Sequence, residues 1–356
     1  MKLHIVGGFL GSGKTTAIAS AARLLIAGGQ RVGIVTNDQG KYLVDTAFFR
    51  ALQLPAVEVT GGCFCCDYDD LDTRLKDLEE SVRPDVIFAE SVGSCADIVA
   101  TVIHPLLALS ARPSSFSVFA DSRLLLQRLR GLPLPFSDDV VYVFDQQIEE
   151  AGLLVINKAD LLPPDALAEL DLLAAARWPS MTLCTQNALA EDGVRRWLER
   201  IQESAPSNTE ALDIDYARYG AGEAELAWLD MRLSVELPDH DARSFIEALA
   251  DELQQALNRA LVPVGHVKLA TEDTTPPVKV SFTTVADTEW RGQIPALEAE
   301  RLTLLVNARA QTPADALDAL VTSALESACA QHGATVRVLS ADHFHPGFPR
   351  PTHRMA

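Results

Sequence analysis

The sequence predicts a doubly wound α/β domain with a mostly parallel sheet, followed by a smaller α+β domain. Over the first 205 residues, short apolar runs alternate regularly with helix-compatible stretches, as they do where helices connect parallel strands. Runs such as Val86–Ala89 and Leu153–Ile156 are apolar on both faces, which is typical of strands covered on both sides. Beyond residue 225 a second series of strands and helices begins, so a separate domain is expected there.

The first domain is expected to span residues 1–205. Its strands are expected at Leu3–Val6, Val32–Thr36, Ala56–Val59, Val86–Ala89, Phe116–Ala120, Leu153–Ile156 and Met181–Cys184. Its helices are expected at 16–29, 69–82, 95–109, 122–130, 139–151, 163–176 and 191–203. Ligands of such a sheet bind beyond the carboxyl ends of the strands, so the loops that follow the strands are expected to form the site.

The remainder of the chain divides into a linker, a second domain and a tail. Residues 206–225 include Pro206 and Ser207 and show no sustained periodicity, so they are expected to be the linker. The domain at 226–343 is expected to be ferredoxin-like, because its strands and helices alternate around a central hairpin. Its strands are expected at Leu226–Leu237, Val264–Ala270, Val278–Val285, Leu302–Ala308 and Thr335–Leu339, and its helices at Ala242–Leu261 and Pro313–His332. Residues 344–356 are expected to form an irregular tail.

The composition excludes several classes of partner. The chain of 356 residues carries 49 acidic and 30 basic residues, a formal net charge of −19. Nucleic acids and anionic membranes bind basic surfaces instead. No apolar run approaches the length that spans a bilayer, and the N-terminus lacks the basic and apolar regions of a signal peptide. A cytoplasmic protein that binds neither nucleic acid nor membrane is therefore expected.

The stretch from Gly8 to Thr15, GFLGSGKT, has the G-x-x-x-x-G-K-[ST] pattern of a phosphate-binding loop. It lies between an expected strand and an expected helix, which is the context that this motif requires. The glycines let backbone N–H groups turn inward around phosphate oxygens, and the helix that follows adds its positive N-terminal end. Lys14 would reach the β- and γ-phosphates, and the Thr15 hydroxyl would complete the shell of a magnesium ion.

A second motif, Asn157-Lys158-Ala159-Asp160, directly follows the expected strand Leu153–Ile156. A carboxylate at the position of Asp160 can accept hydrogen bonds from the N1–H and N2 amino groups of guanine. Adenine lacks this pair of donors, so the motif favours GTP over ATP.

A third motif, Glu90-Ser91-Val92-Gly93, ends the expected strand Val86–Ala89. Glu90 can bind magnesium directly or through water, and Gly93 would let the backbone approach the γ-phosphate, as in a nucleotide switch. Asp38, after the second strand, is another candidate acid. For both acids, a solvated loop carboxylate is the alternative.

Three of the six cysteines, Cys63, Cys65 and Cys66, lie within four positions after the third expected strand. Thiolates suit zinc and similar ions, and three of them leave a tetrahedral ion one ligand short. Asp38, a water molecule or a partner could complete the site. Buried small apolar residues or a redox dithiol are the alternatives. Cys95 is either a fourth thiolate or a buried cysteine at the start of a helix.

Together and in this order, GFLGSGKTT, GGCFCC, ESVG and NKAD resemble the CobW-type family of metal-handling P-loop GTPases, whose relatives deliver nickel to hydrogenase and urease. The resemblance covers residues 1–205. It implies hydrolysis of GTP with Mg²⁺ and binding of Zn²⁺ or another transition metal such as cobalt. It also implies delivery of the metal, or of a metallocofactor, to a client apo-metalloenzyme. A homodimer is compatible with the sequence, which does not fix the oligomeric state.

The resemblance implies roles for individual residues. Catalysis would involve Lys14, Thr15 and Glu90. The nucleotide would be bound by Gly8, Gly11, Ser12, Gly13, Lys14, Thr15, Thr16, Gly93, Asn157, Lys158 and Asp160. Metal ions would be bound by Cys63, Cys65, Cys66, Thr15, Glu90 and Asp38. The family usually has glutamate in place of Asp38, and many members have a histidine-rich loop that this sequence lacks.

Two other functions compete with a GTP-hydrolysing metallochaperone. The first is a non-enzymatic metal-binding module whose affinity is set by GTP, which an added apo-client would not stimulate. The second is a P-loop kinase acting on a small molecule. Asn157–Asp160 disfavours the kinase because this motif selects guanine, and no arginine-rich lid is evident.

Overall fold

The computed structural model describes residues 1–40, 44–109, 113–203, 210–275, 277–283 and 289–355. The chain forms two compact units, each built from separated segments of the sequence. The first contains Met1–Gln39, Leu54–Gly222 and Phe348–Ala356, and the second contains Gly40–Gln53 and Glu223–Gly347. This division differs from the single break expected at 206–225. Of that expected linker, residues 206–209 lie outside the described residues, and Tyr216–Ala224 forms helix α9.

A seven-stranded sheet forms the centre of the first unit, with all strand pairs parallel. The strand order is β3-β2-β4-β1-β5-β6-β7, which confirms the predicted doubly wound fold. The strands are β1 (Lys2–Gly8), β2 (Val32–Asp38), β3 (Ala56–Thr60), β4 (Val86–Glu90), β5 (Pro113–Asp121), β6 (Leu153–Asn157) and β7 (Thr182–Thr185).

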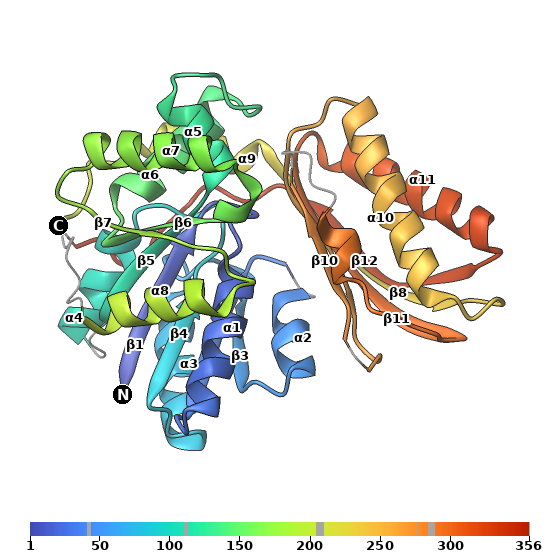
Figure 1. The fold of residues 1–356 in the computed structure, drawn as a ribbon, viewed down its shortest axis with the longest axis horizontal. Coiled ribbons are helices and arrows are strands. Elements are labelled where there is room, and N and C mark those ends of the chain that lie inside the picture. Colours follow the sequence, from blue (N-terminus) through green and yellow to red (C-terminus); the bar gives the residue numbers. More distant parts are fainter. Residues whose placement is uncertain (41–43, 110–112, 204–209, 276, 284–288, 356) are drawn as a thin grey trace. The chain divides into compact units, whose positions relative to one another are not determined.

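Helices cover both faces of this sheet. In Figure 1, α1 and α8 lie toward one side of the sheet, and α5, α6 and α7 lie toward the other. The described helices of the unit are α1 (Lys14–Ala27), α3 (Tyr68–Ser81), α4 (His104–Leu109), α5 (Ser122–Leu129), α6 (Asp138–Glu149), α7 (Pro164–Arg177), α8 (Glu191–Glu203) and α9.

One predicted helix of the first unit, 95–109, begins later than expected. Residues 91–97 form a loop, and a π-helical turn at Val99–Ile103 precedes α4. Asp97 has a φ of 64°, a left-handed conformation that α-helices do not contain. The side chain of Gln147 on α6 also binds the backbone carbonyls of Gly93 and Cys95 (3.0 and 2.9 Å). These contacts hold the segment in a loop, and the sequence pattern did not reveal them.

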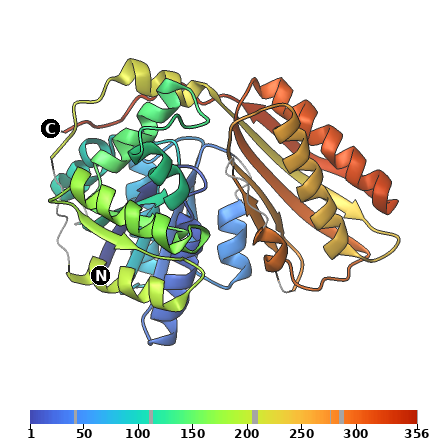
Figure 2. The ribbon, with the colours of Figure 1, turned by 45° about the horizontal axis from the view of Figure 1, so that its top comes forward.

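The second unit is an antiparallel sheet with the order β10-β9-β11-β8-β12. Without the edge strand β10, this order and the intervening helices are those of the ferredoxin-like fold, which confirms the prediction. Figure 2 shows α10 and α11 running side by side along one face of the sheet. The elements are β8 (Leu226–Glu236), α10 (Ala242–Arg259), β9 (Val264–Thr271), β10 (Lys279–Phe282), β11 (Arg301–Gln311), α11 (Ala314–His332) and β12 (Thr335–Phe344).

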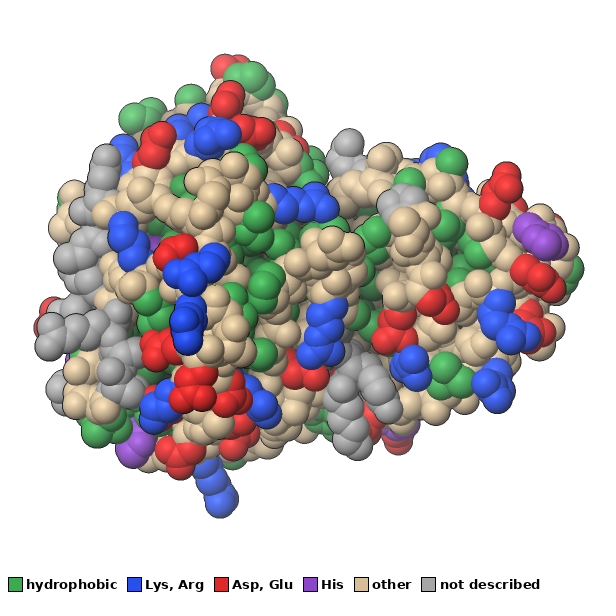
Figure 3. All heavy atoms as spheres, turned by 90° about the horizontal axis from the view of Figure 1, so that it is seen from below, with side chains coloured by type: hydrophobic (Ala, Val, Ile, Leu, Met, Phe, Trp, Pro, Cys, Tyr) green, Lys and Arg blue, Asp and Glu red, His purple; other side chains and the backbone are tan. Residues whose placement is uncertain are grey.

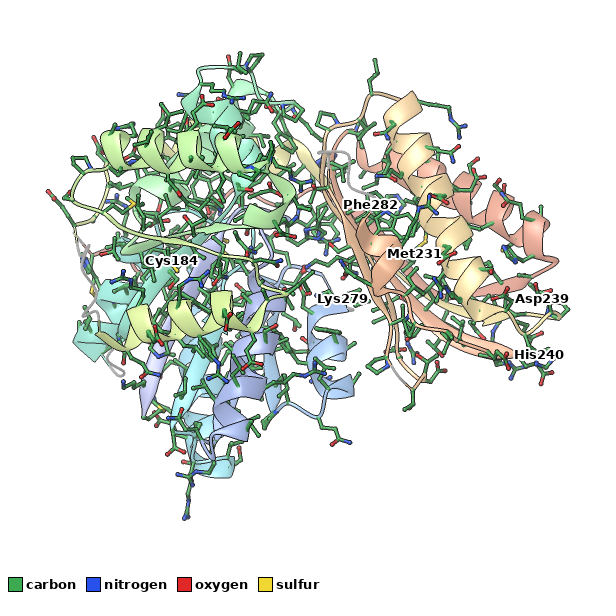
Figure 4. All side chains as sticks on the ribbon, viewed as in Figure 1. Cys184, Met231, Asp239, His240, Lys279 and Phe282 are labelled. Atoms are coloured by element: carbon green, nitrogen blue, oxygen red, sulfur yellow. The ribbon has the colours of Figure 1, made fainter. Side chains whose placement is uncertain are left out.

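Helix α2 (Val44–Ala51) belongs to the second unit, although it lies between β2 and β3 in the sequence. Its Asp45 forms ion pairs with Lys268 on β9 and with Lys279 on β10. Figure 4 labels Lys279. Burial alone would raise the pKa of Asp45, but the two ammonium groups hold it well below its usual range. Val44 packs with Ala270 and Leu305. The sequence analysis assigned no element to these residues, because their partners lie more than 200 residues away.

Charged side chains of both signs are mixed over the surface. On the face in Figure 3, lysine and arginine alternate with aspartate and glutamate and form no continuous basic area. Within the described parts of the chain, no helix has the length and apolar character needed to cross a bilayer.

Trp197 anchors α8 to the central sheet of the first unit. Its side chain is 0% exposed and packs against Phe88 and Phe119, with ring centroids 5.7 and 5.1 Å away. Its indole N–H donates a hydrogen bond of 3.0 Å to Ser117 Oγ. The substitution Trp197→Ala should therefore lower the free energy of unfolding by about 3–5 kcal/mol, because it leaves a large cavity.

Urea unfolding followed by circular dichroism would measure this loss. Leu172→Ala is the control, because Leu172 is 74% exposed and its truncation should change stability little. Equal stability of the two variants would show that Trp197 does not anchor α8.

Candidate nucleotide and metal site

The phosphate loop between β1 and α1 depends on glycine at particular positions. Gly8, Gly11 and Gly13 have φ values of 124°, 73° and 90°, which side chains rarely tolerate. A Cβ on Gly8 would lie 2.2 Å from the carbonyl oxygen of Phe119 on β5. A Cβ on Gly13 would lie 2.4 Å from Asn157 Nδ2. The loop is thus held close to β5 and β6 in a conformation that turns its backbone inward.

Polar side chains gather where this loop enters α1. Lys14 is buried, and its ammonium group donates to the carbonyls of Gly8 (2.6 Å) and Phe9 (3.3 Å). The Ser12 hydroxyl is buried and has no hydrogen-bond partner among the described residues. A cation, a buried hydroxyl and a helix N-terminus at one place suit a phosphate group. Thr16, the next residue but one after Lys14, is half-buried.

Glu90 joins the end of β4 to the phosphate loop. Its carboxylate, 5% exposed, accepts a hydrogen bond of 2.8 Å from the Thr15 hydroxyl. Three residues later, a Cβ on Gly93 would lie 3.1 Å from the Cα and N of Leu10 in the phosphate loop. The structure therefore brings Thr15, Glu90 and Gly93 to the phosphate loop, as the sequence suggested.

Asn157, the last residue of β6, connects three loops. Its Nδ2 donates to the carbonyl of Ser12 in the phosphate loop (2.8 Å), and its Oδ1 accepts from the N–H of Ala188 after β7 (3.1 Å). The next residue, Lys158, has a φ of 59°. Asp160 is exposed at the same carboxyl edge. Asn157 thus holds the loop that carries Asp160 at a fixed position relative to the phosphate loop.

Asp121, the last residue of β5, is a charged site residue that the sequence analysis missed. Its carboxylate is 2% exposed and contacts Lys158 Nζ (3.1 Å) and the guanidinium of Arg123 (2.7 Å). Burial by itself would raise the pKa of Asp121, but the charges of Lys158 and Arg123 outweigh burial and lower it to about 2. The sequence feature that could have identified Asp121 is an acidic residue between the end of an expected strand and the start of an expected helix.

Asn37 near the end of β2 shapes the cysteine loop after β3. Its Nδ2 donates to the carbonyls of Val59 (3.2 Å) and Gly62 (2.7 Å), and its Oδ1 accepts from the N–H of Phe64 (2.8 Å). A single buried amide therefore bends the chain around the cysteines. The sequence analysis did not identify it, because an asparagine at a strand end gives no indication of such distant partners.

The three clustered cysteines point their sulfur atoms at one another, with all three Sγ atoms within 4.8 Å. The Sγ atoms of Cys63 and Cys65 are 2.6 Å apart, and those of Cys65 and Cys66 are 3.8 Å apart. Hydrogen bonds from Cys65, Cys66 and Cys95 hold the pKa of Cys63 well below its usual range. The hydrogen bond to Cys63 raises the pKa of Cys66 to about 11. The cluster therefore favours one thiolate, on Cys63.

Asp38, proposed from the sequence as a ligand, lies outside this compact group of sulfur atoms. It is the last residue of β2, where its Cα pairs in register with Thr60 of β3, and it is half-buried.

The segment Phe348–Met355 passes along the cysteine loop of the same unit. The N–H of Arg350 donates to Cys66 Sγ (3.3 Å), and the N–H of Thr352 donates to the carbonyl of Cys65 (2.8 Å). The Arg354 guanidinium contacts the buried carboxylate of Asp97 (2.8 Å). The segment has no helix or strand, as expected of the tail, but these contacts fix it in place.

The parallel sheet, its helices and the glycine-rich loop between β1 and α1 define the first unit as a P-loop nucleotide-binding domain. Residues 2–179 match the nucleotide-binding domain of the CobW/HypB/UreG family. The chain belongs to this family.

Two curated relatives and one solved structure are similar to parts of the chain. A zinc chaperone CobW of Sinorhizobium sp. is 30% identical over 192 residues, which are 46% of this chain and 52% of that protein. The urease accessory protein UreG of Aliarcobacter butzleri (strain RM4018) is 33% identical over 183 residues, 49% of this chain and 81% of that protein. The chain thus spans about half the length of the CobW relative. HypB from Helicobacter pylori in complex with nickel has a TM-score of 0.42 at 18% identity, covering 60% of this chain and 92% of that one.

The depressed pKa of Asp121 predicts a pH-dependent contribution to stability. Because the folded-state pKa of about 2 lies below the ordinary 3.8, the charged carboxylate stabilises the fold above about pH 4. This contribution disappears as the pH falls through the folded-state value. Asp121→Asn should thus cost about 2 kcal/mol at pH 7 and progressively less toward pH 2.

Urea unfolding at pH 7, 4 and 3 would test this, with the exposed Asp192→Asn as the control. A difference between Asp121→Asn and the unmutated protein that grows as the pH falls would contradict the assignment.

Proposed function

We propose that this protein hydrolyses GTP with magnesium and couples its nucleotide state to the binding and delivery of a transition metal to a client apo-metalloenzyme. Zinc is the metal we favour. The observation that carries the proposal is the placement of two loops on one sheet. The phosphate loop follows β1 and the three-cysteine loop follows β3, and both leave the carboxyl edge of the same parallel sheet.

The residues around Lys14 support GTP as the nucleotide. Lys14 and the N-terminus of α1 would hold the β- and γ-phosphates, and Gly93 would bring its backbone to the γ-phosphate. The exposed Asp160 would accept the two guanine donors. Asn157 supports this arrangement, because its hydrogen bond to Ser12 fixes the spacing between the two halves of the nucleotide site.

The pair formed by Thr15 and Glu90 fits a magnesium ion. A hydroxyl and a carboxylate, both buried and 2.8 Å apart, are hard oxygen ligands of the kind that magnesium prefers. When bound, magnesium would neutralise charge on the β- and γ-phosphates. The residues of this chain would orient the nucleotide and exclude bulk water from it.

The cysteine cluster fits a soft metal ion as cargo. Sulfur atoms within 4.8 Å of one another can converge on one ion, and thiolates favour zinc and copper(I) over magnesium. The chain's membership of a metallochaperone family supports delivery to a client. A metal-binding module whose affinity is set by GTP but which does not hydrolyse it is the competing function, and only the metallochaperone should hydrolyse GTP faster when an apo-client is added.

The nucleotide assignment predicts a different defect in each of two variants. Lys14→Ala should abolish GTP binding, because it removes the phosphate-binding charge, and Asp160→Asn should lose the preference for guanine over adenine. Turnover of the unmutated protein should be slow, ~10⁻⁴–10⁻² per second, because no arginine finger is evident. Isothermal titration and phosphate release with GTP and ATP would measure these effects.

The matched controls are the exposed Lys76→Ala and Asp165→Asn, which should behave like the unmutated protein. Equal affinity of the unmutated protein for GTP and ATP would overturn the guanine assignment.

Metal and nucleotide binding should be linked. If the γ-phosphate orders the loops at the carboxyl edge, zinc affinity should differ between the GDP state and the state with a non-hydrolysable GTP analogue. The expected ratio is ~5–150-fold, and zinc should change the preference for the GTP analogue over GDP by the same factor. Zinc affinity should also fall as the pH falls, because thiols must lose protons to bind.

A zinc titration against a chromogenic chelator in both nucleotide states measures this ratio. Cys65→Ser/Cys66→Ser should lose the site, whereas Cys329→Ser, in the second unit, should retain it. A ratio of one would contradict any coupling between the nucleotide state and metal binding.

A further inference from the structure

Cys95 lies in the loop after β4 and not at the start of a helix. It is 1% exposed, and helical structure begins only at Ile98. Its N–H donates to the carbonyl of Val92 (3.1 Å), and its own carbonyl accepts from Gln147 Nε2 (2.9 Å). The backbone of Cys95 is therefore fixed from two sides, and its side chain has a defined direction.

The thiol of Cys95 interacts with two of the three clustered cysteines. It takes part in side-chain hydrogen bonds with both Cys63 and Cys65, which belong to the loop after β3. In the sheet, β2 lies between β3 and β4, and Asn37 at the end of β2 draws the cysteine loop inward through its bond to Gly62. Two loops from non-adjacent strands thus bring the Cys95 thiol next to Cys63 and Cys65, although its sulfur lies outside the group of three sulfurs that are within 4.8 Å of one another.

We propose that Cys95 is the fourth protein ligand of the metal and closes a four-cysteine site with Cys63, Cys65 and Cys66. This inference rests on the metal site of the proposed function. Binding would displace the remaining thiol protons, and four thiolates would coordinate one Zn²⁺ without any change of oxidation state.

Among Cys63, Cys65 and Cys66 the sulfur positions are close to those that such a site needs, whereas Cys95 Sγ, outside the group within 4.8 Å, must move closer. With Zn–S bonds of ~2.3 Å in a tetrahedron, neighbouring sulfurs lie ~3.8 Å apart. The Cys65–Cys66 distance of 3.8 Å already has this value, whereas Cys63 and Cys65, at 2.6 Å, must separate by about 1 Å. Ordinary rotamer adjustment on a loop supplies a movement of this size.

A fourth thiolate on this segment changes how metal release would work. A four-coordinate zinc site has no open position, so the ion leaves only after a ligand detaches. Cys95 is two residues from Gly93, whose backbone abuts the phosphate loop at Leu10. Movement of this segment on a change of nucleotide would therefore withdraw one ligand directly, while the three ligands after β3 stay together.

Zinc X-ray absorption on the unmutated protein tests the proposal without a variant. Loaded with one equivalent of zinc, the protein should show four sulfur neighbours. Three sulfurs with one oxygen or nitrogen would overturn the role of Cys95 but leave the metal site of the proposed function intact. Failure to bind zinc at all would overturn both.

The variant Cys95→Ser gives an independent measure, with Cys184→Ser as its matched control. Cys184 is also buried and lies on β7 (Figure 4), outside the cluster. Zinc binding to Cys95→Ser should release about one proton fewer than binding to the unmutated protein. The ratio of zinc affinities in the two nucleotide states should also shrink toward one.

Both values should be unchanged in Cys184→Ser, and GTP binding should be retained in both variants as a check of folding. Unchanged proton release and an unchanged affinity ratio in Cys95→Ser would identify Cys95 as a buried core residue and overturn the proposal.

Discussion

Two buried asparagine side chains fix the positions of loops of the first unit relative to the sheet, and both candidate sites depend on them. Asn157 joins the phosphate loop to the loops after β6 and β7, and Asn37 joins β2 to the cysteine loop. A carboxamide can donate and accept at once, so a single side chain satisfies the backbone of two loops that no regular structure pairs. The strand ends of a parallel sheet are rigid. Hydrogen bonds from these two amides fix the neighbouring loops to the strand ends.

Sequence reasoning identified the features that local chemistry determines. The phosphate loop, the Glu90 segment, the Asn157–Asp160 motif and the cysteine loop each consist of adjacent residues, so their patterns are visible without a structure. The ferredoxin-like second fold followed from strand and helix order. Apart from the pair formed by Asp121 and Arg123, the contacts that were missed are long-range. Asn157 and Ser12 are 145 residues apart, and Cys66 and Arg350 are 284 residues apart, and no periodicity encodes such pairs.

Charge is used differently at the two sites. Around the nucleotide loops, opposite charges are paired: Asp121 with Lys158 and Arg123. At the cysteines, negative charge is shared by neighbouring thiols through hydrogen bonds. Paired ions give a rigid frame whose charges do not change with pH near neutrality. A thiolate that is stabilised by neighbouring thiols can instead bind an incoming cation. The charge-paired frame and the cysteine loop therefore differ in their electrostatics on one sheet.

Helix α2 has a consequence for how the chain reaches its final structure. The N–H of Val44 bonds to the side chain of Asn307, 263 residues later in the sequence. During synthesis on the ribosome, α2 emerges long before the strands on which it packs. Its apolar side cannot be buried until β9 and β11 have been made. Closing so long a stretch of chain is slow. The polypeptide between β2 and β3 therefore completes its packing only after almost the whole protein has been made, which exposes it to chaperones and proteases in the interval.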